Sequence, residues 1–357
     1  MDNCVKVLVV DDSAFMRYTI AKHLEADPGI TVVGSARDGL EALSKIPALR
    51  PDVITLDVEM PRLDGLSALQ RIMAEYPTPV VMLSSLTQRG TRTTIQALIR
   101  GAVDFVAKPE ASTEIRTVVE SLIEKIKTAA KVNLATRQVT VAPAGPEISV
   151  EPSSRGKLGL RPLQTGDPVI VIGASTGGPR ALQRVLSDLP ADLPAAVTVV
   201  QHMPPGFTRS LAQRLNEASA LTVQEAVNGD RLARGLVLLA PGDFHMRLKD
   251  HKQIALDQGP RRHHVRPSVD VTMESVAEYH KSAVIGVVLT GMGSDGAEGA
   301  GLIKSAGGKI IAENESTSVV YGMPRSVVEA GLADRIVPLP EVASALVEMV
   351  NNGSTGI

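Results

Sequence analysis

Three carboxylates in the first sixty residues have the type and spacing to bind a divalent cation. Asp11 and Asp12 directly follow the apolar run 7–10, and Asp57 ends the apolar run 53–57. Because the carboxyl ends of parallel strands meet at one edge of a sheet, we expect the three side chains to lie close together. Their mutual repulsion favours a hard cation with oxygen ligands. The sequence therefore predicts an Mg²⁺ site formed by Asp11, Asp12 and Asp57.

A site of this kind can place a phosphoryl group on a carboxylate. Asp57 can attack a phosphoryl donor in line when a cation neutralises both partners. Two groups follow later apolar runs: we expect Ser84 to hydrogen bond to one phosphoryl oxygen and Lys108 to pair with another. The alternative is that strand-end aspartates only cap helices and turns. That alternative explains each residue singly but not the whole set in this order.

The second half of the chain carries a different set of reactive residues. Ser175 lies in Gly-Ala-Ser-Thr-Gly, a G-x-S-x-G pattern that exposes a serine hydroxyl between a strand and a helix. His202 follows one apolar run, and Asp295 lies in a glycine-rich segment after another. If these strands share a sheet, the three residues can act as nucleophile, general base and orienting acid.

Two further residues are predicted to stabilise a tetrahedral oxyanion. They are Thr176, through its hydroxyl, and Met292, through its main-chain N–H. One such donor is typically worth roughly 10²–10³ in kcat.

A binding function without catalysis is the alternative for this half of the chain. Glycine-rich turns between strand and helix also bind phosphate groups at helix N-termini, so a nucleotide or a partner protein could occupy the segment around Ser175. The sequence lacks a G-x-x-x-x-G-K-[ST] motif and has no good G-x-G-x-x-G motif. The order Ser–His–Asp also differs from the Ser–Asp/Glu–His order of α/β-hydrolases, which disfavours that fold.

Alternating apolar and helical patterns position these residues. In the first part we expect strands at 5–10, 30–34, 53–57, 80–84 and 103–107, with helices at about 14–26, 38–48, 65–75, 91–100 and 113–131. In the second part we expect strands at 169–172, 197–201, 236–240, 284–289 and 309–312, with helices near 179–187, 207–217, 268–280, 295–305 and 341–350. The segment 244–256 is expected to form a hairpin. Strands alternating with helices predict α/β domains with mainly parallel sheets.

The predicted architecture is thus two doubly wound α/β domains, the first with five strands in a flavodoxin-like arrangement and the second Rossmann-like. We expect the first domain at residues 4–125, a flexible linker at 126–166 that is rich in Pro, Gly and Ser, and the second domain at 167–352.

Composition excludes several other classes of function. The 357 residues carry a net charge of −2 and only 2% aromatic residues, which gives no support for nucleic acid binding. We find no apolar run near the roughly 20 residues that span a bilayer, so no membrane insertion is expected. The one cysteine, Cys4, and a start without signal-peptide features predict a cytoplasmic protein.

The first third of the chain resembles two-component receiver domains over about residues 4–125. The resemblance rests on Val-Leu-Val-Val-Asp-Asp-Ser at 7–13, Asp-Val-Glu-Met-Pro at 57–61 with Asp64-Gly65, and Lys108-Pro109. It implies Mg²⁺-dependent phosphoryl transfer from a chemotaxis histidine kinase to Asp57, with Ser84 at a position that is usually Thr or Ser. Phe105 stands where many receivers carry a switch aromatic, and a plain core phenylalanine is the other interpretation.

The second half resembles the catalytic domain of chemotaxis protein-glutamate methylesterases over about residues 165–350. The resemblance rests on four segments: Ile-Gly-Ala-Ser-Thr-Gly-Gly-Pro at 172–179, Gln-His-Met-Pro-Pro-Gly-Phe at 201–207, Arg-Pro-Ser-Val-Asp at 266–270, and Leu-Thr-Gly-Met-Gly-Ser-Asp-Gly-Ala at 289–297. It implies hydrolysis of glutamate γ-methyl esters on methyl-accepting chemoreceptors, and deamidation of receptor glutamines. Ser175, His202 and Asp295 fall on the family's triad, and ester hydrolysis is expected to need no cofactor.

The order of the two domains suggests how the enzyme is controlled. We expect the unphosphorylated receiver to lie against the mouth of the esterase site. A phosphoryl group on Asp57 adds roughly −1.5 to −2 charge, which would draw in Ser84 and Lys108 and loosen that packing. We also expect Arg261, Arg262 and Arg266 to contact an acidic receptor surface.

Overall fold

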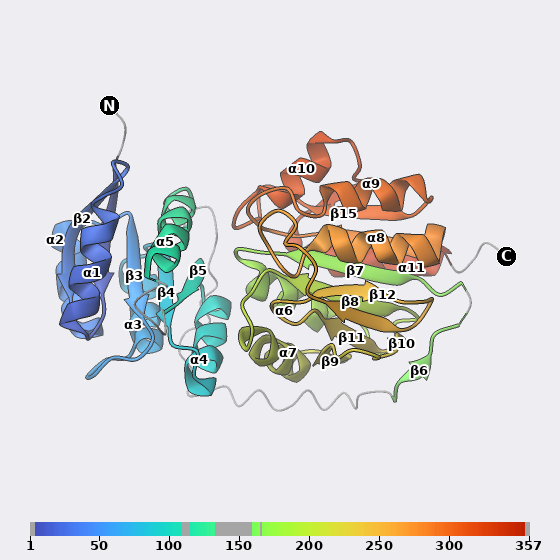
Figure 1. Ribbon diagram of the computed structural model, residues 1–357, viewed down its shortest axis with the longest axis horizontal. Coiled ribbons are helices and arrows are strands. Elements are labelled where there is room, and N and C mark those ends of the chain that lie inside the picture. The colour runs from blue at the N-terminus through green and yellow to red at the C-terminus, as the bar shows by residue number, and fades with distance from the viewer. Residues whose placement is uncertain (1–3, 109–114, 133–158, 165, 354–357) are drawn as a thin grey trace. The chain divides into compact units, whose positions relative to one another are not determined.

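The computed structural model of the protein describes residues 4–108, 115–132, 159–164 and 166–353. The chain divides between residues 147 and 148 into two compact units. Each unit is a parallel sheet with helices on both faces (Figure 1).

The first unit is built on a five-stranded parallel sheet in the order β2-β1-β3-β4-β5. Its strands are buried because helices cover both faces, and the side chains of 7–10 and 53–56 are almost wholly inaccessible to solvent. The strands are β1 (Val5–Val10), β2 (Ile30–Ala36), β3 (Val53–Asp57), β4 (Val80–Ser84) and β5 (Asp104–Ala107).

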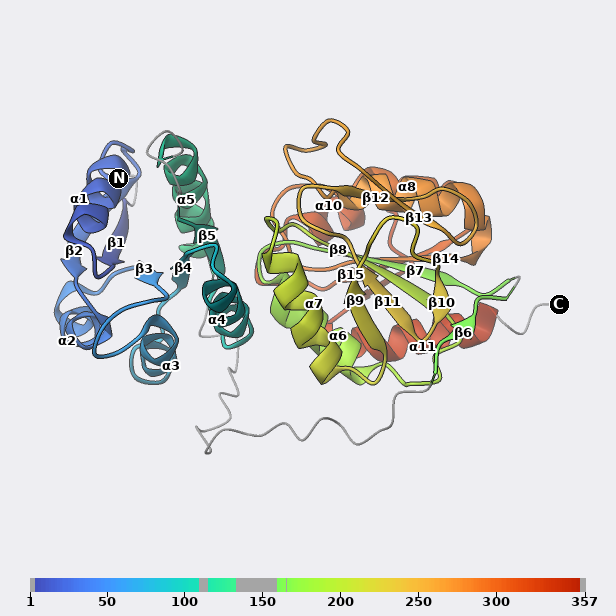
Figure 2. The same ribbon diagram turned by 60° about the horizontal axis from the view of Figure 1, so that its bottom comes forward.

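Five helices cover this sheet, with α1 and α5 on one face and α2, α3 and α4 on the other (Figure 2). The first four begin at polar side chains that accept main-chain N–H bonds, namely Ser13, Asp38, Asp64 and Thr87. The helices are α1 (Ala14–Leu24), α2 (Gly39–Leu49), α3 (Gly65–Glu75), α4 (Gln88–Ile99) and α5 (Ile115–Ala129).

The second unit has a seven-stranded parallel sheet in the order β16-β15-β14-β7-β8-β11-β9. Strand β7 lies at the centre, with β8, β11 and β9 on one side and β14, β15 and β16 on the other. The carboxyl end of β7 is therefore the switch point where sites form in such sheets. The strands are β7 (Val169–Ala174), β8 (Ala196–Gln201), β9 (Thr222–Glu225), β11 (Leu236–Leu239), β14 (Val284–Val288), β15 (Lys309–Glu313) and β16 (Arg335–Val337).

Helices lie on both faces of the second sheet, with α8, α9 and α10 on one and α6, α7 and α11 on the other (Figures 1 and 2). They are α6 (Gly178–Asp188), α7 (Phe207–Ala218), α8 (Val269–His280), α9 (Ala297–Ser305), α10 (Met323–Glu329) and α11 (Val342–Gly353), with 3₁₀ helices η2 (Lys281–Ala283) and η3 (Leu339–Glu341). Two small antiparallel pairs complete the unit: β6 (Arg161–Pro162) with β10 (Ala233–Arg234), and β12 (His245–Leu248) with β13 (Ile254–Asp257).

The structure confirms the predicted fold class and the predicted hairpin, and the predicted main strands agree to within two residues at each end. Strands β9 and β16 and helix α10 were not predicted from the sequence. The first two are edge strands of three or four residues with mixed burial, so they lack the continuous apolar run that marks a central strand. Helix α10 has seven residues and begins at a Met-Pro pair, which is too short for a helical period to be visible.

The predicted linker, 126–166, is described only at its ends. Helix α5 continues to Ala129, and β6 pairs with β10, while 133–158 and 165 lie outside the described residues. The predicted bounds of the two domains and of the linker therefore stay predictions. No helix among the described residues is long and apolar enough to cross a membrane.

Two residues that precede β7, Leu163 and Asp167, are buried in the second unit. Leu163 is 3% exposed and packs in the main apolar cluster, and its carbonyl accepts a bond from Lys252 Nζ. Asp167 accepts a 2.6 Å bond from Arg234 Nε.

A catalytic unit that begins at Gly159 is therefore expected to be more stable than one that begins at Pro168. Loss of Leu163 and of the Asp167–Arg234 pair should cost roughly 3 kcal/mol, which lowers Tm by about 6–12 °C for a unit of this size. Thermal unfolding of the two truncated proteins measures the difference. Equal Tm values would show that the segment before Pro168 contributes nothing to stability.

Candidate active and phosphorylation sites

Two neighbouring strands bring Ser175 and His202 to the same edge of the second sheet. Ala174 of β7 and Gln201 of β8 are direct partners in the parallel register, so the next residue of each strand leaves the sheet at the same level. The main-chain N–H of His202 donates to the carbonyl of Ala174 at 3.1 Å. The serine and the histidine thus lie about one strand spacing, roughly 5 Å, apart at their main chains.

Strand β14 pairs with β7 on its other side and delivers Asp295. Val288 is the register partner of Gly173, and the loop that follows returns over the end of β7, where the N–H of Ser175 donates to the carbonyl of Thr290. Asp295 ends this loop, directly before the N-cap of α9. Its Oδ2 accepts a 2.7 Å hydrogen bond from Nε2 of His202.

The carboxylate of Asp295 is 2% exposed and its bonding capacity is full. Besides His202, it accepts bonds from the hydroxyl of Ser268 and from the N–H groups of Val269 and Asp270, at 2.7–2.9 Å. Burial alone would raise the pKa of Asp295, but the bonds from His202 and the two amides outweigh burial and hold the pKa well below its usual range. The group therefore stays ionised and can stabilise a cationic imidazole.

The turn that carries Ser175 depends on close contacts that only glycine permits. A Cβ added at Gly178 would lie 1.9 Å from Oε1 of Gln201, and one added at Gly291 would lie 2.8 Å from Cβ of Ser175. Gln201 uses its Nε2 to donate to the carbonyl of Ser175 at 2.9 Å, and to that of His202 at 3.2 Å. One side chain thus fixes the main chain of both residues.

A buried glutamate supports the loop after β14. Glu313, which is 0% exposed at the end of β15, accepts a bond from the N–H of Thr290 and another from the hydroxyl of Thr317. The hydroxyl of Thr290 in turn donates to the carbonyl of Thr176, and the N–H of Val320 donates to that hydroxyl. The sequence analysis missed Gln201, Thr290 and Glu313, although each lies at a strand end, where such roles occur.

The predicted triad is only partly joined by hydrogen bonds. Among the described residues, the structure contains the His202–Asp295 bond but no hydrogen bond between Ser175 Oγ and His202. The predicted oxyanion donors lie in the two loops that flank the serine. Thr176 is 8% exposed in the turn after β7, and Met292 is 44% exposed in the loop after β14. Their roles stay predictions.

The three arginines expected to face an acidic receptor are paired with carboxylates of their own domain. Arg261 and Arg266 both bind Asp243, and Arg262 binds Glu274 and Glu298. Because carboxylates of the same domain already pair with these arginines, the structure gives no support for their expected contact with an acidic receptor surface.

The candidate phosphorylation site of the first unit is a compact cluster of charges at the ends of β1, β3 and β5. Lys108 Nζ lies 2.8 Å from Asp11 Oδ2 and 2.7 Å from Asp57 Oδ2. Both carboxylates are almost completely buried, whereas Asp12 is exposed. One oxygen from each of the three aspartates lies within 4.8 Å of the others.

This cluster fits a hard divalent cation. All candidate ligands are carboxylate oxygens, as Mg²⁺ prefers. Burial raises the pKa of Asp57 to about 6, against the lowering effect of Lys108, and the charge of Asp11 adds to the rise. Carboxylates in this situation are incompletely compensated by one lysine, so a cation between them would stabilise the ionised form.

Ser84, the predicted partner of a phosphoryl group, is bonded elsewhere in this structure. Its Oγ lies 2.6 Å from Oγ1 of Thr94 in α4 and donates to the carbonyl of Ser85. Phe105 is 3% exposed, with Lys125 Nζ 5.2 Å from its ring centre, so in this structure it packs as a core residue.

Comparisons with known proteins agree with this two-part organisation. Residues 170–346 match the family model for the CheB methylesterase, and residues 7–120 match that for the response regulator receiver domain. Proteins named protein-glutamate methylesterase/protein-glutamine glutaminase are similar over almost the whole chain. The one from Symbiobacterium thermophilum is 53% identical over 98% of both chains, and the one from Thermotoga maritima is 46% identical over 98% of this chain and 99% of its own.

A solved structure is similar to the second unit. The crystal structure of the Thermotoga maritima CheB methylesterase catalytic domain is 49% identical and has a TM-score of 0.50. It covers 51% of this chain and 98% of its own.

The raised pKa of Asp57 leads to a stability prediction. Its folded pKa of about 6 exceeds the unfolded value of 3.8, so ionised Asp57 destabilises the fold above pH 6, and this cost disappears as pH falls below 3.8. In Mg²⁺-free buffer at pH 8, Asp57→Asn should therefore stabilise the first unit by on the order of 3 kcal/mol.

Equilibrium unfolding of wild type and Asp57→Asn at pH 8, with and without Mg²⁺, measures this effect. Mg²⁺ should decrease the difference in the free energy of unfolding between the variant and wild type, because Mg²⁺ stabilises the ionised carboxylate that only the wild type has. A variant that is less stable than wild type in Mg²⁺-free buffer at pH 8 would contradict this account of the cluster.

Proposed function

The chain belongs to the CheB methylesterase family, in which a receiver domain precedes a catalytic domain, and we propose that Ser175, His202 and Asp295 carry out its reaction. It is a phosphorylation-activated protein-glutamate methylesterase and protein-glutamine glutaminase of chemotaxis. Membership of this family does not favour the alternative of a binding module without catalysis.

The observation that carries the proposed triad is the 2.7 Å bond between His202 and a fully bonded Asp295, one strand away from Ser175. Because Nε2 of His202 is bonded to Asp295, Nδ1 is the ring nitrogen left to accept a proton from Ser175. We propose that a rotation of the Ser175 side chain, or the arrival of substrate, forms the hydrogen bond between the serine and this nitrogen. Catalytic bonds are often long or absent before substrate binds.

The first chemical step forms an acyl-enzyme. Ser175 Oγ attacks the γ-carbonyl carbon of the substrate while His202 takes its proton, which gives a tetrahedral oxyanion and an imidazolium. The ionised Asp295 stabilises that imidazolium. When the intermediate collapses, the C–O bond to the methyl group's oxygen breaks, His202 returns the proton, and methanol leaves.

The second step restores the serine. A water molecule attacks the glutamyl ester while His202 takes its proton, and collapse returns that proton to Ser175 Oγ and releases the glutamate side chain. A glutamine substrate gives the same glutamyl-enzyme, except that the C–N bond breaks and ammonia leaves. One triad can therefore perform both reactions of the family.

The oxyanion requires donors that point to the carbonyl oxygen. We assign this role to the hydroxyl of Thr176, in the turn after β7, and to the main-chain N–H of Met292, in the loop after β14. Support comes from the bond between the Thr290 hydroxyl and the Thr176 carbonyl, which holds the two loops together at 2.9 Å.

The receiver controls this chemistry through Asp57. Asp11, Asp12 and Asp57 would hold Mg²⁺, which supplies charge neutralisation when a phosphoryl group is transferred from a two-component kinase. Asp57 is the acceptor, and Lys108 pairs with a phosphoryl oxygen. Ser84 reaches another oxygen by leaving Thr94, which transmits the change to α4. The proposed phosphodonor is a chemotaxis histidine kinase, and the proposed substrates are methyl-accepting chemoreceptors.

Substitutions in the triad test the proposed reaction directly. Ser175→Ala should abolish methanol release from methylated receptor, and Asp295→Asn should lower kcat by roughly 10⁴ because the imidazolium loses its counter-charge. Thr176→Ala should lower kcat by roughly 10² with little change in KM. Substitution of the exposed serine Ser187, whose hydroxyl donates to the carbonyl of Gln183 in its own helix, is a matched control. Normal methanol release by Ser175→Ala would reject the proposed nucleophile.

Regulation by the receiver predicts a second pattern of rates. A phosphodonor such as acetyl phosphate, with Mg²⁺, should raise the activity of the whole chain but not that of Asp57→Asn. A catalytic unit that begins at Gly159 should be faster than the unphosphorylated chain if the receiver occludes the site. Equal rates for these two proteins would reject inhibition by occlusion while leaving the triad untouched.

A further inference from the structure

A second buried carboxylate lies beside Asp295 and has no part in the proposed reaction. Asp270 is 0% exposed in the first turn of α8. Single ligand atoms of Asp270, Asp295 and His263 all lie within 4.8 Å of one another. Two negative charges this close in the protein interior repel each other strongly, so their coexistence needs a physical explanation.

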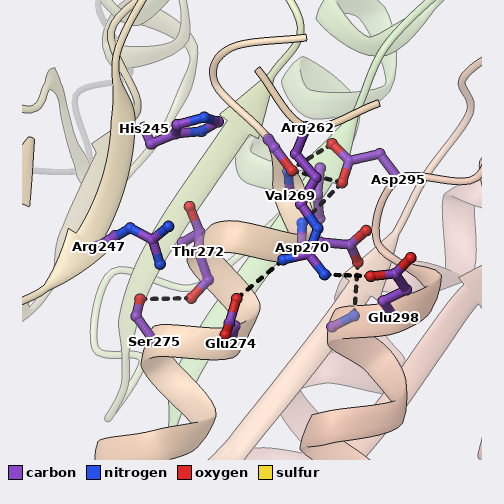
Figure 3. Close-up of polar contacts among 12 residues, drawn as sticks. His245, Arg247, Arg262, Val269, Asp270, Thr272, Glu274, Ser275, Asp295 and Glu298 are labelled. Atoms are coloured by element: carbon purple, nitrogen blue, oxygen red, sulfur yellow. Dashed lines mark hydrogen bonds and ion pairs between the residues drawn. The ribbon is translucent and has the colours of Figure 1, made fainter. Parts of the chain in front are cut away.

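The two aspartates cap each other's helices. Asp295 precedes α9, yet it accepts the N–H groups of Val269 and Asp270 at the start of α8. Asp270 belongs to α8, yet its Oδ1 accepts the N–H groups of Gly296 and Gly299 at the start of α9, at 2.9 and 2.6 Å. Figure 3 shows the two side chains between the ends of the helices. The partial positive charge of both N-termini thus compensates the pair.

This exchange ties the catalytic carboxylate to Asp270 at two points. The N–H of Asp270 donates to Asp295 Oδ1, and the side chain of Asp270 holds Gly296, the residue directly after Asp295. The hydrogen bonds of the two aspartates therefore form a closed network that connects one carboxylate to the other in both directions. Any movement of Asp270 shifts the oxygen that receives the hydrogen bond from His202.

The outer oxygen of Asp270 is held by a histidine. His263 Nε2 donates to Asp270 Oδ2 at 2.8 Å, and the side chain of His263 is 30% exposed. Several other charged or titratable groups that face the pair, or lie on elements packed against it, are hydrogen bonded or ion-paired: Arg262 with Glu274 and Glu298, His202 with Asp295, His245 with the Pro260 carbonyl, Arg247 with Asp257, and Lys304 with Asp334. Glu278 of α8 and Lys281 of η2 are further charged groups on these elements.

The charge of Asp270 is not required for capping. A neutral asparagine oxygen could accept both amide bonds that Oδ1 accepts, and its NH₂ could face His263. Burial raises the pKa of Asp270, and the neighbouring Asp295 raises it further, although the Gly299 amide and His263 lower it. An ionised aspartate at this position therefore costs stability that an asparagine would not cost.

We propose that Asp270 is a positioning residue of the methylesterase reaction: it fixes Asp295 by reciprocal helix capping and places a second negative charge behind the imidazolium that forms in the transition state. This inference rests on the proposed triad. As His202 accepts the proton of Ser175, the ring becomes cationic, and the Asp295–Asp270 pair stabilises that charge more than Asp295 alone. His263 keeps Asp270 ionised by donating to its outer oxygen.

Asp270→Asn tests this role because it preserves the shape and removes the charge. Loss of one unit charge from behind the imidazolium should lower kcat at least about tenfold. KM should not change, because the residue does not touch the substrate. At pH 8, Tm should be equal to that of wild type or higher, since the cost of the ionised group disappears. If Asp270→Asn lowers kcat only together with a matching decrease in Tm, Asp270 is a structural helix cap and the proposal is wrong.

The pH profile separates a charge effect from a merely structural one. The wild type loses the charge of Asp270 as pH falls through its raised pKa, whereas the variant has no charge at any pH. The ratio of wild-type to variant kcat/KM should therefore be largest at alkaline pH and decline toward acidic pH. A ratio that does not depend on pH would overturn the proposal.

Two reference variants keep the result unambiguous. Asp167→Asn removes a carboxylate paired with Arg234 at the opposite edge of the sheet, before β7, and should lower Tm without changing kcat. Ser175→Ala is measured in the same methanol-release assay. If Ser175→Ala is active, the proposed triad itself fails. If Ser175→Ala is inactive and Asp270→Asn has normal kcat, only the present inference fails.

Discussion

The hydrogen bond between His202 and Asp295 is the contact on which the proposed chemistry depends. It joins residues 93 positions apart in the chain, and it exists because the sheet places β8 and β14 on opposite sides of β7. The bond orients the ring only if the carboxylate is itself immobile. Three further donors, all at the start of α8, provide that immobility. The fold thus contributes to catalysis mainly by fixing one acceptor.

Both units bury carboxylates, and they compensate the negative charge of these groups in different ways. Each gathers buried carboxylates at the carboxyl ends of parallel strands, where burial penalises the ionised form. In the receiver, one lysine side chain, Lys108, bridges Asp11 and Asp57, and it compensates their charge incompletely. That leaves the cluster responsive to a cation and to a phosphoryl group. In the catalytic unit, main-chain amides at the starts of two helices bind Asp295 and Asp270, so the fold itself holds both carboxylates in place.

The sequence predicted the parts of this structure that depend on local pattern. Strands β7, β8 and β14 are apolar runs, and each reactive residue follows one of them, so parallel pairing alone brings Ser175, His202 and Asp295 to one edge. The same reasoning placed Asp11, Asp57, Ser84 and Lys108 in the receiver. Residues that act through distant packing were not predictable in this way. Glu313 supports the catalytic loop from β15, and His263 reaches Asp270 from an irregular segment, so neither has a local signature of its role.

The central claim is that Ser175 is a nucleophile activated by His202. Reaction with a serine-directed covalent probe, followed by location of the adduct by peptide mass spectrometry, tests it most directly because no receptor substrate is needed. The account expects a single adduct on Ser175 that forms much more slowly in His202→Asn. An adduct on another serine, or labelling of Ser175 that is unaffected by the loss of His202, would contradict it.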